Sequence, residues 1–338
     1  MKRLFWPAGM LVALVWAADI NQPALKMFAP LPKEVQNSKN PLSEGKIELG
    51  RMLYYEPRLS KSQEVSCNTC HLLDRYGADG EPVSTGHNGL KGNRNSPTVY
   101  NAAGHFVQFW DGRAPDVEQQ AKGPVTNPVE MAMSSESTVI AVLKSIPEYV
   151  AAFQKAFPGQ DDPVTFDNMA AAIGAFERKL VTPSRWDKFL QGDAAALTAA
   201  EKAGFNKFVD AGCAACHNGA YVGGMLYQKI GVVKPWSQDS DPGRYGVTKQ
   251  EGERGVFKVP SLRNIEKTGP YFHTGKVPQL DGAVALMSEY QTGRALSGDD
   301  IQAIVTWLRS LTGEIPADYV KKPALPRSTA RTPLPDRS

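Results

Sequence analysis

The sequence predicts a mainly α-helical protein built from two domains. A chain of 338 residues is long enough for each half to bury a core of its own. The same five-residue pattern, C-x-x-C-H, stands once in each half, at residues 67–71 and 213–217. Apolar residues at helical spacing precede each copy, so the two halves resemble a weak internal duplication.

The C-x-x-C-H pattern uses all four cysteines of the chain. A Cys-x-x-Cys pair alone could be a redox dithiol or half of a zinc site, but a histidine directly after it is what covalent haem attachment requires. The thiols bond to the haem edge, and the imidazole binds the iron from one face. Each half is therefore expected to be a cytochrome c-like helical domain holding one covalently attached haem. The expected attachment residues and iron ligands are Cys67, Cys70, His71, Cys213, Cys216 and His217.

The composition and the first residues limit the classes of protein to which the chain can belong. Hydrophobic residues at 42%, charged residues at 22% and a net charge of +3 are ordinary for a soluble protein and give no indication of a nucleic-acid partner. Residues 1–18 read as a signal peptide, with a basic start, an apolar run and the small residues Ala17 and Ala18. The apolar run is shorter than the roughly 20 residues of a spanning helix. We expect export and no membrane span in the mature form.

The helical segments can be placed in order along the chain. Helical spacing before the motifs covers residues 47–53 and 203–209, and further helices are expected at 137–157 and 166–181, broken by Pro147 and Pro158. Helices at 279–290 and 299–311 follow the second motif. The boundary at 181–184 gives two domains, 19–182 and 183–313, each with one haem. Residues 314–338 form a Pro-rich basic tail, expected to be extended or disordered.

Several runs resemble the bacterial di-haem cytochrome c peroxidases, relatives of the methylamine-utilisation di-haem enzymes. The runs are VSTGH (83–87), GNRNSPT (92–98), QFWDGR (108–113), AKGP (121–124), KSIPEY (144–149) and PYFH (270–273). The resemblance covers roughly residues 41–313. It implies that the haem of domain 19–182 is the peroxidatic one and that the haem of domain 183–313 accepts the electrons. It implies a periplasmic cytochrome-c peroxidase that reduces hydrogen peroxide to water with electrons from a small c-type cytochrome or cupredoxin. The sequence leaves a homodimer open.

The resemblance also implies the remaining iron ligands. It places His87 as a displaceable second ligand of the first haem, although the glycines around His87 equally fit a solvated loop histidine. It places Met287 on the second haem, which raises the potential relative to a second histidine. Met287 could alternatively be a core methionine, and Met225 is a rival ligand. His273 matches a family residue near this haem, whereas His105 is expected to be an ordinary polar histidine.

Three further residues carry the implied peroxide chemistry. Heterolytic cleavage of a peroxide needs an iron with an open face and a group that moves a proton between the two oxygens. The resemblance assigns Glu130 and Gln120 to that face, and Trp110 to the space between the haems. Taken alone, Glu130 and Gln120 would be read as solvated side chains and Trp110 as a core aromatic.

The resemblance implies one calcium ion between the domains, held by Asn95, Thr268 and Pro270. Carbonyl oxygens suit calcium, but these residues form no recognisable motif by themselves. A second candidate, the loop with Asp239 and Asp241, fails because its twelfth position is a glutamine.

Two other functions compete with the peroxidase. The related enzymes that oxidise tryptophans of a partner protein carry a tyrosine as an axial ligand, and Met287 argues against that class. A plain electron carrier would have no open iron, and Glu130 and Gln120 argue against it. Peroxide turnover with reduced cytochrome c discriminates the carrier from the enzyme.

Overall fold

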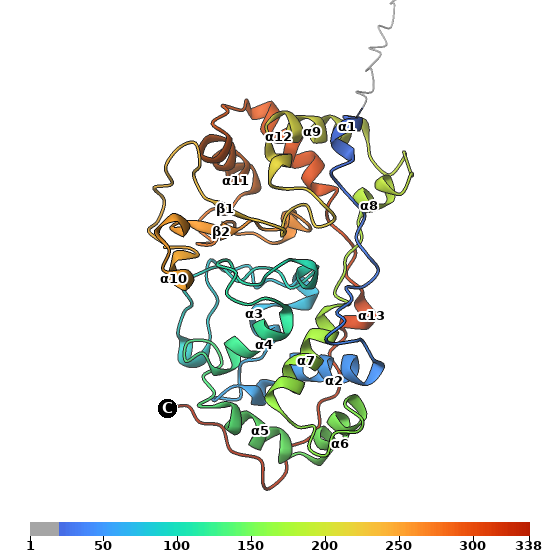
Figure 1. Ribbon diagram of the computed structural model, residues 1–338, viewed down its shortest axis with the longest axis vertical. Helices are drawn as coiled ribbons and strands as arrows, with labels where there is room; N and C mark the ends of the chain where they lie inside the picture. Colours follow the sequence, from blue (N-terminus) through green and yellow to red (C-terminus); the bar gives the residue numbers. More distant parts are fainter. Residues whose placement is uncertain (1–19) are drawn as a thin grey trace, which may run out of the picture.

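The computed structural model describes residues 20–338 (Figure 1). The expected signal peptide, residues 1–18, lies outside the described residues. The structure is helix-rich, which confirms the mainly α-helical class, and it adds one small antiparallel sheet that the sequence did not predict. Among residues 20–338, no helix combines the length and the apolar character needed to cross a bilayer.

The helices and strands follow the chain in a simple order. The helices are α1 (Gln22–Leu25), α2 (Glu44–Tyr54), α3 (Cys67–Cys70), α4 (Val117–Thr126), α5 (Glu136–Lys144), α6 (Pro147–Ala156), α7 (Phe166–Glu177), α8 (Arg185–Leu190), α9 (Ala199–Asp210), α10 (Tyr245–Thr248), α11 (Leu280–Met287), α12 (Gly298–Arg309) and α13 (Ala317–Val320). The strands are β1 (Tyr227–Lys229) and β2 (Val256–Lys258), with Gln228 opposite Phe257. Short 3₁₀ turns stand between these elements, including η1 (Pro57–Leu59), η3 (His87–Gly89), η5 (Cys213–Ala215) and η7 (Ile265–Lys267).

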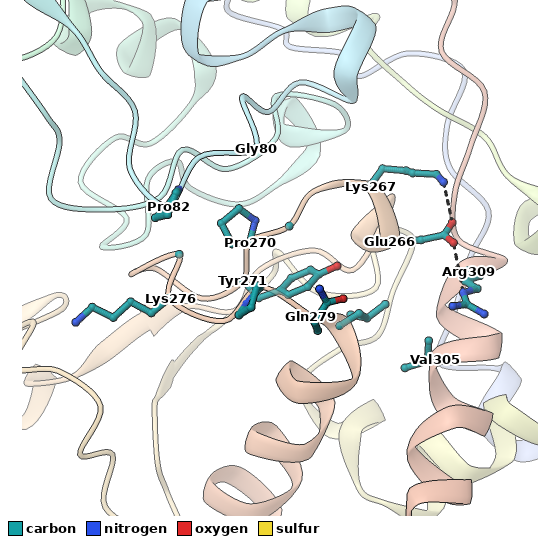
Figure 2. Close-up of a pocket in the computed structure, with 14 residues that line it drawn as sticks. Gly80, Pro82, Glu266, Lys267, Pro270, Tyr271, Lys276, Gln279, Val305 and Arg309 are labelled. Carbon is teal, nitrogen blue, oxygen red and sulfur yellow. Dashed lines mark ion pairs between the residues drawn. The ribbon is translucent and has the colours of Figure 1, made fainter. Parts of the chain in front are cut away.

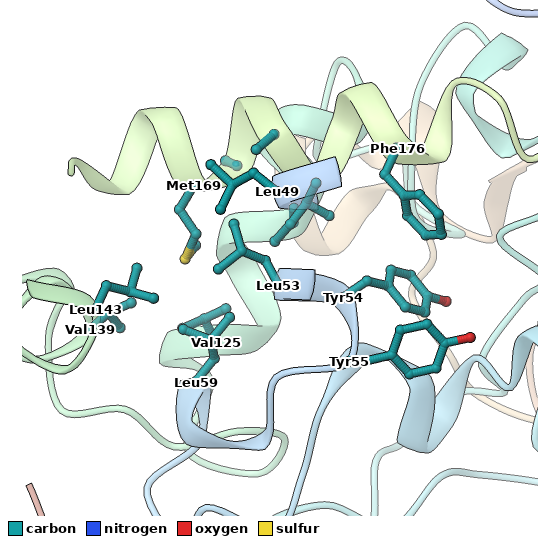
Figure 3. Packing of buried hydrophobic residues seen from close by; sticks show 14 of the residues in the cluster. Leu49, Leu53, Tyr54, Tyr55, Leu59, Val125, Val139, Leu143, Met169 and Phe176 are labelled. Atoms are coloured by element: carbon teal, nitrogen blue, oxygen red, sulfur yellow. The ribbon is translucent and has the colours of Figure 1, made fainter. Parts of the chain in front are cut away.

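The first core lies between α2 and α7, closed by α4, α5 and α6 (Figure 3). Leu49 and Leu53 of α2 are fully buried there, beside Met169 of α7. The two helices approach closely at Gly50, where an added Cβ would lie 1.9 Å from the main-chain oxygen of Ala172. The close crossing fixes α2, which leads to the first C-x-x-C-H motif.

The second core lies where α9 crosses α12. An added Cβ at Gly204 of α9 would lie 2.0 Å from the Ala303 main-chain oxygen, so only glycine permits this crossing. Trp186, Phe205 and Trp307 fill the core, and the Phe205 and Trp307 rings meet edge-to-face at 5.3 Å. Helix α9 leads directly into the second motif, as α2 leads into the first.

Each end of the described chain packs against the half of the molecule that is distant from it in the sequence. Phe28, near the start, packs edge-to-face on Trp186 of the second core at 5.6 Å. The tail, residues 314–338, runs back along the first half, passes α5 and ends beside Lys61 (Figure 1). Val320 of α13 joins the first core, and its main-chain oxygen accepts a 2.5 Å hydrogen bond from the Tyr55 hydroxyl. The division at residue 182 stays a prediction, but each half is completed by a segment from the other end.

A buried ion-pair cluster joins the halves near the sheet. The Arg94 Nε donates to Asp241 at 2.7 Å, and its Nη1 donates to Asp111 at 2.6 Å. The three side chains are at most 15% exposed, so these pairs are shielded from solvent. Breaking one partner would leave a buried charge uncompensated, which typically costs about 3–5 kcal/mol.

Candidate active site

The first C-x-x-C-H motif is a short helix whose geometry presents both thiols and the imidazole. The Ser66 main-chain N–H donates to the Thr69 hydroxyl at 3.0 Å, which starts α3, and the His71 N–H donates to the Cys67 oxygen at 3.0 Å. The Tyr54 hydroxyl of α2 donates to the His71 oxygen at 2.8 Å. The first core therefore holds the motif through α2.

The second motif repeats this arrangement. Turn η5 follows α9 through Gly212, which has a φ of 83°. The His217 N–H donates to the Cys213 oxygen at 3.0 Å, as in the first motif. An added Cβ at Gly223 would lie 2.2 Å from the Pro260 oxygen and 3.1 Å from the His217 Nδ1. Only glycine at position 223 therefore allows the main chain to lie this close to Pro260 and to the His217 ring.

The chemistry of both motifs fits a haem. Burial lowers the pKa of His71, and burial lowers the pKa of His217 to about 4, so both imidazoles are neutral, the form that binds a metal. No disulfide joins any of the four cysteines, all of which the structure describes, so both sulfurs of each motif are available for haem attachment. Burial raises the pKa of Cys67 to about 12 and that of Cys213 to about 11, as expected for thiols in apolar surroundings.

The structure places His87 and Glu130 side by side. The His87 N–H donates to the Glu130 main-chain oxygen at 2.8 Å. An added Cβ at the preceding Gly86 would lie 2.2 Å from the Val129 oxygen, so the loop needs glycine there. The His87 side chain is only 5% exposed. A buried ring differs from the solvated loop histidine that was one of the two sequence interpretations.

Glu130 also lies close to the first motif. Burial is the main cause of the raised pKa of Cys70, about 11, and the negative charges of Asp79 and Glu130 add to it. Burial raises the pKa of Glu130 itself, while the nearby Arg113 and a 2.8 Å hydrogen bond from the Asn127 amide oppose the rise. A carboxyl with a raised pKa beside the motif is suited to taking up and releasing a proton.

Helix α4 contributes one wall of this region. Gln120 is half-buried on α4, and Gly123 lies one turn later. The helix ends at Asn127, the residue that binds Glu130. An added Cβ at Gly123 would lie 3.5 Å from the Phe109 ring, on which the Arg113 guanidinium stacks at 3.4 Å. Within residues 20–338, no hydrogen bond joins the Gln120 and Glu130 side chains.

Sequence reasoning assigned no role to Arg113 or Asn127. Both set the charge state of Glu130, Arg113 through its cation and Asn127 through its amide. Arg113 stood within the run QFWDGR, where a cation close to two aromatics was the available signal. Asn127 precedes Pro128 at the end of a helix, a pattern that equally indicates an ordinary helix end.

Trp110 lies where the halves meet. Its indole Nε1 donates to the Asn95 main-chain oxygen at 2.9 Å, and its ring contacts His273 edge-to-face at 6.1 Å. Its main-chain oxygen accepts a 2.8 Å hydrogen bond from the Lys258 N–H of β2. His273 stacks on Phe257 at 4.2 Å. The indole is therefore clamped between both halves of the molecule.

The candidate second-haem ligands differ in environment. Met287 is half-buried and ends α11, where a π-helical turn (Ser288–Thr292) begins. Met225 is 50% exposed in the loop before β1. His105 is half-buried, and its Nδ1 accepts from the buried Lys258 Nζ at 3.3 Å. Burial lowers the pKa of Lys258 to about 8.

One of the three candidate calcium residues, Pro270, lies at a cleft of about 720 Å³ between the halves (Figure 2). Pro270 lines this cleft opposite Gly80 and Pro82. The Asn95 Nδ2 donates to the Glu81 oxygen at 3.0 Å, which orients its side chain at the same loop. Thr268 ends η7, two residues before Pro270.

The acidic side chains of this region have other partners. In the rejected loop, Asp241 pairs with Arg94, and Asp239 accepts from Trp236 at 2.8 Å and lies 3.1 Å from the His273 Nε2. Within residues 20–338, no three His, Cys, Asp or Glu side chains cluster in a way that could hold a metal. A calcium ion between the halves would depend on carbonyl oxygens.

Comparison with known proteins identifies the family. The family model described as di-haem cytochrome c peroxidase matches residues 44–195. The chain is 48% identical to the cytochrome c551 peroxidase of Pseudomonas aeruginosa over 95% of this chain and 94% of that protein. It belongs to the di-haem cytochrome c peroxidase family.

Two further relatives agree with the family. The cytochrome c551 peroxidase of Nitrosomonas europaea is 46% identical over 91% of both chains. A MauG-like protein associated with microbial copper homeostasis has a crystal structure that superposes with a TM-score of 0.78 at 28% identity, covering 87% of this chain and 97% of that one. The di-haem peroxidase fold thus accounts for nearly the whole described chain.

Proposed function

We propose that the protein reduces hydrogen peroxide to two waters, using two electrons from a small c-type cytochrome or cupredoxin in the periplasm. Membership of the di-haem cytochrome c peroxidase family makes it an oxidoreductase that acts on peroxide. The observation that carries the site assignment is the meeting of Glu130, the His87 loop and the first motif.

In this proposal, haem is attached through both cysteine pairs and supplies the redox-active iron. His71 would bind the first iron and His217 the second, each as a neutral buried imidazole. The reaction consumes one peroxide, two protons and two electrons and yields two waters. Glu130 would take the proton from one peroxide oxygen and deliver it to the other, with Gln120 orienting the substrate from α4.

The remaining residues would have roles in electron transfer from the second haem to the first. Met287 would complete the second haem and favour its reduced state, so that this haem accepts electrons first. Trp110, clamped between the halves, would lie on the path to the first haem. The calcium ion, if held by Asn95, Thr268 and Pro270, would fix the contact between halves beside Trp110.

Steady-state turnover of the holoprotein tests the proposal. Reduced cytochrome c, mixed with hydrogen peroxide and catalytic amounts of protein, should be oxidised at two equivalents per peroxide consumed. A protein that exchanges electrons with cytochrome c but leaves peroxide unchanged would be an electron carrier instead. Oxidation of a partner protein's tryptophans without turnover of cytochrome c would favour the methylamine-utilisation class.

A further inference from the structure

The tail is docked along the first half by a series of specific contacts. The Arg58 Nη2 of η1 donates to the Pro326 oxygen at 2.8 Å. The Thr329 hydroxyl donates to the Ser145 oxygen at 2.8 Å, and the Gln63 Nε2 donates to the Pro333 oxygen at 2.8 Å. The tail is therefore held in place although it is extended and rich in proline.

The last described residues fold onto the loop that precedes the first motif. The Asp336 N–H donates to the Lys61 oxygen at 2.9 Å, and the Lys61 Nζ donates to the Ser338 main-chain oxygen at 3.0 Å. Arg337 pairs with Glu64 at 2.6 Å. Lys61 and Glu64 stand just before Cys67, so residues 336–338 lie beside the first motif.

These residues also contact the His87 loop. The His87 Nε2 lies 3.4 Å from the Ser338 main-chain oxygen, and the Asn88 Nδ2 donates to the Arg337 oxygen at 3.2 Å. Because a carbonyl oxygen only accepts hydrogen bonds, the Nε2 must carry the proton. The loop is thus bracketed between Glu130, which binds the His87 N–H, and the tail.

In the tautomer that donates to this oxygen, the Nε2 carries a proton and has no lone pair free to bind an iron. We propose that residues 337–338 act as a latch that holds His87 away from the first iron and so favours the form that can bind peroxide. This inference rests on the proposed function, in which His87 is the displaceable ligand. The tail segment is a positioning element, because it acts through His87.

The strength of the contacts suits a reversible latch. The Arg337–Glu64 pair is largely exposed, with side chains 71% and 56% accessible, so it contributes little. The two loop contacts are single hydrogen bonds of ordinary or long length. Together they should shift the equilibrium between bound and released His87 on the order of tenfold, which biases the two states without locking either.

Removal of residues 335–338 from the full holoprotein tests the latch. Electron paramagnetic resonance and visible spectra of the half-reduced protein report low-spin and high-spin populations of the first haem. The truncated protein should show about tenfold more of the low-spin form relative to the high-spin form. Leu334→Ala is the matched control, since Leu334 is in the same segment but 87% exposed; its spectra should equal those of the wild type.

A point variant tests the same contact with the tail intact. Asn88 has a φ of 52°, which glycine adopts freely, so Asn88→Gly removes the bond to Arg337 without strain. It should shift the populations in the same direction by about threefold. Unchanged populations in both the truncated protein and Asn88→Gly would overturn the latch.

A double variant separates the latch from a general loss of structure. In a His87→Gly background no ligand remains to be released, so truncation should leave the spin state of the first haem unchanged. An equal spectral shift in that background would contradict the proposal. Failure of the proposed function would give a different result. Truncation would still change the spin states of the first haem, but the wild-type protein would not reduce peroxide.

Discussion

The indole Nε1 of Trp110 donates a 2.9 Å hydrogen bond to the main-chain oxygen of Asn95. A residue proposed for the electron path is thus tied directly to a residue proposed to bind calcium. Asn95 also donates its N–H to the His273 oxygen at 2.7 Å, so it links Trp110 to the second half. A calcium ion bound at the Asn95 side chain would therefore restrict the motion of the main chain that accepts the hydrogen bond from the Trp110 indole.

Asn95→Ala is expected to weaken calcium binding at least about tenfold, because it removes one oxygen ligand from a site with few. It leaves the main-chain bonds to Trp110 and His273 in place. Isothermal titration of the holoprotein with calcium measures the change. Asp281→Asn, at an exposed carboxylate of α11, is the control and should keep the calcium affinity. An unchanged calcium affinity in Asn95→Ala would remove Asn95 from the site.

Glu130→Gln is expected to lower kcat/KM for peroxide by about 10²–10⁴, the usual contribution of a positioned acid–base group. Burial raises the pKa of Glu130 above 4.5. The base role needs the carboxylate, so wild-type activity should fall as the pH drops through this raised pKa, and the variant should lack that acid limb. Glu136→Gln, at an exposed glutamate of α5, should keep both the rate and the pH profile.

Met287→His is expected to lower the potential of one haem only, on the order of 0.1–0.3 V, because imidazole favours the ferrous state less than a thioether does. Spectroelectrochemical titration measures both haems separately. Met225→Leu, at an exposed side chain, is the control and should leave both potentials as they are. If Met225→Leu lowered a potential and Met287→His did not, Met225 would be the ligand.

The sequence predicted the local features of this structure far better than the long-range ones. The helices leading to Cys67 and Cys213 could be read from periodicity, because an amphipathic helix records its buried face in its own spacing. The packing of Phe28 on Trp186 could not be read, because it joins segments that are distant in the sequence. The same holds for the bond from Tyr55 to Val320.

The candidate site also combines local features, which the sequence predicts, with long-range contacts, which it does not. The two motifs carry their chemistry in five consecutive residues, so spacing alone identified them. The surroundings of Glu130 depend on Arg113 and Asn127, whose roles arise only when the loops meet. The burial of Lys258 in a three-residue strand had no signal, since a lone lysine is ordinarily a solvated residue.

Lys258→Met is expected to stabilise the protein at neutral pH by up to about 3 kcal/mol, because burial lowers the pKa of Lys258 from 10.5 to about 8. Below pH 8, Lys258 is protonated in both the folded and the unfolded protein. The folded protein then contains a buried positive charge, which destabilises it. Between pH 8 and 10.5 only the unfolded state holds the proton, so wild-type stability should rise with pH from this residue. The variant should lack that rise in chemical unfolding at pH 7 to 10.

Lys229→Met provides the comparison for this substitution. Lys229 is exposed on β1, so the same change should alter the unfolding midpoint little and leave its pH dependence intact. A Lys258→Met protein that was less stable than the wild type at pH 7 would show that the contact with His105 outweighs the cost of burying the charge.

His87→Gly is expected to convert the first haem of the fully oxidised protein to a high-spin form that reacts with peroxide without prior reduction. An iron with imidazole on both faces cannot bind peroxide, so the resting wild type should react only after the second haem is reduced. Glycine also suits the loop, because Gly86 and Gly89 already surround the position. Electron paramagnetic resonance reports the spin state, and stopped-flow mixing reports the reaction with peroxide. A variant that stayed low-spin and still required reduction would show that another residue occupies the sixth position, and that the buried contact between His87 and the tail serves the loop alone.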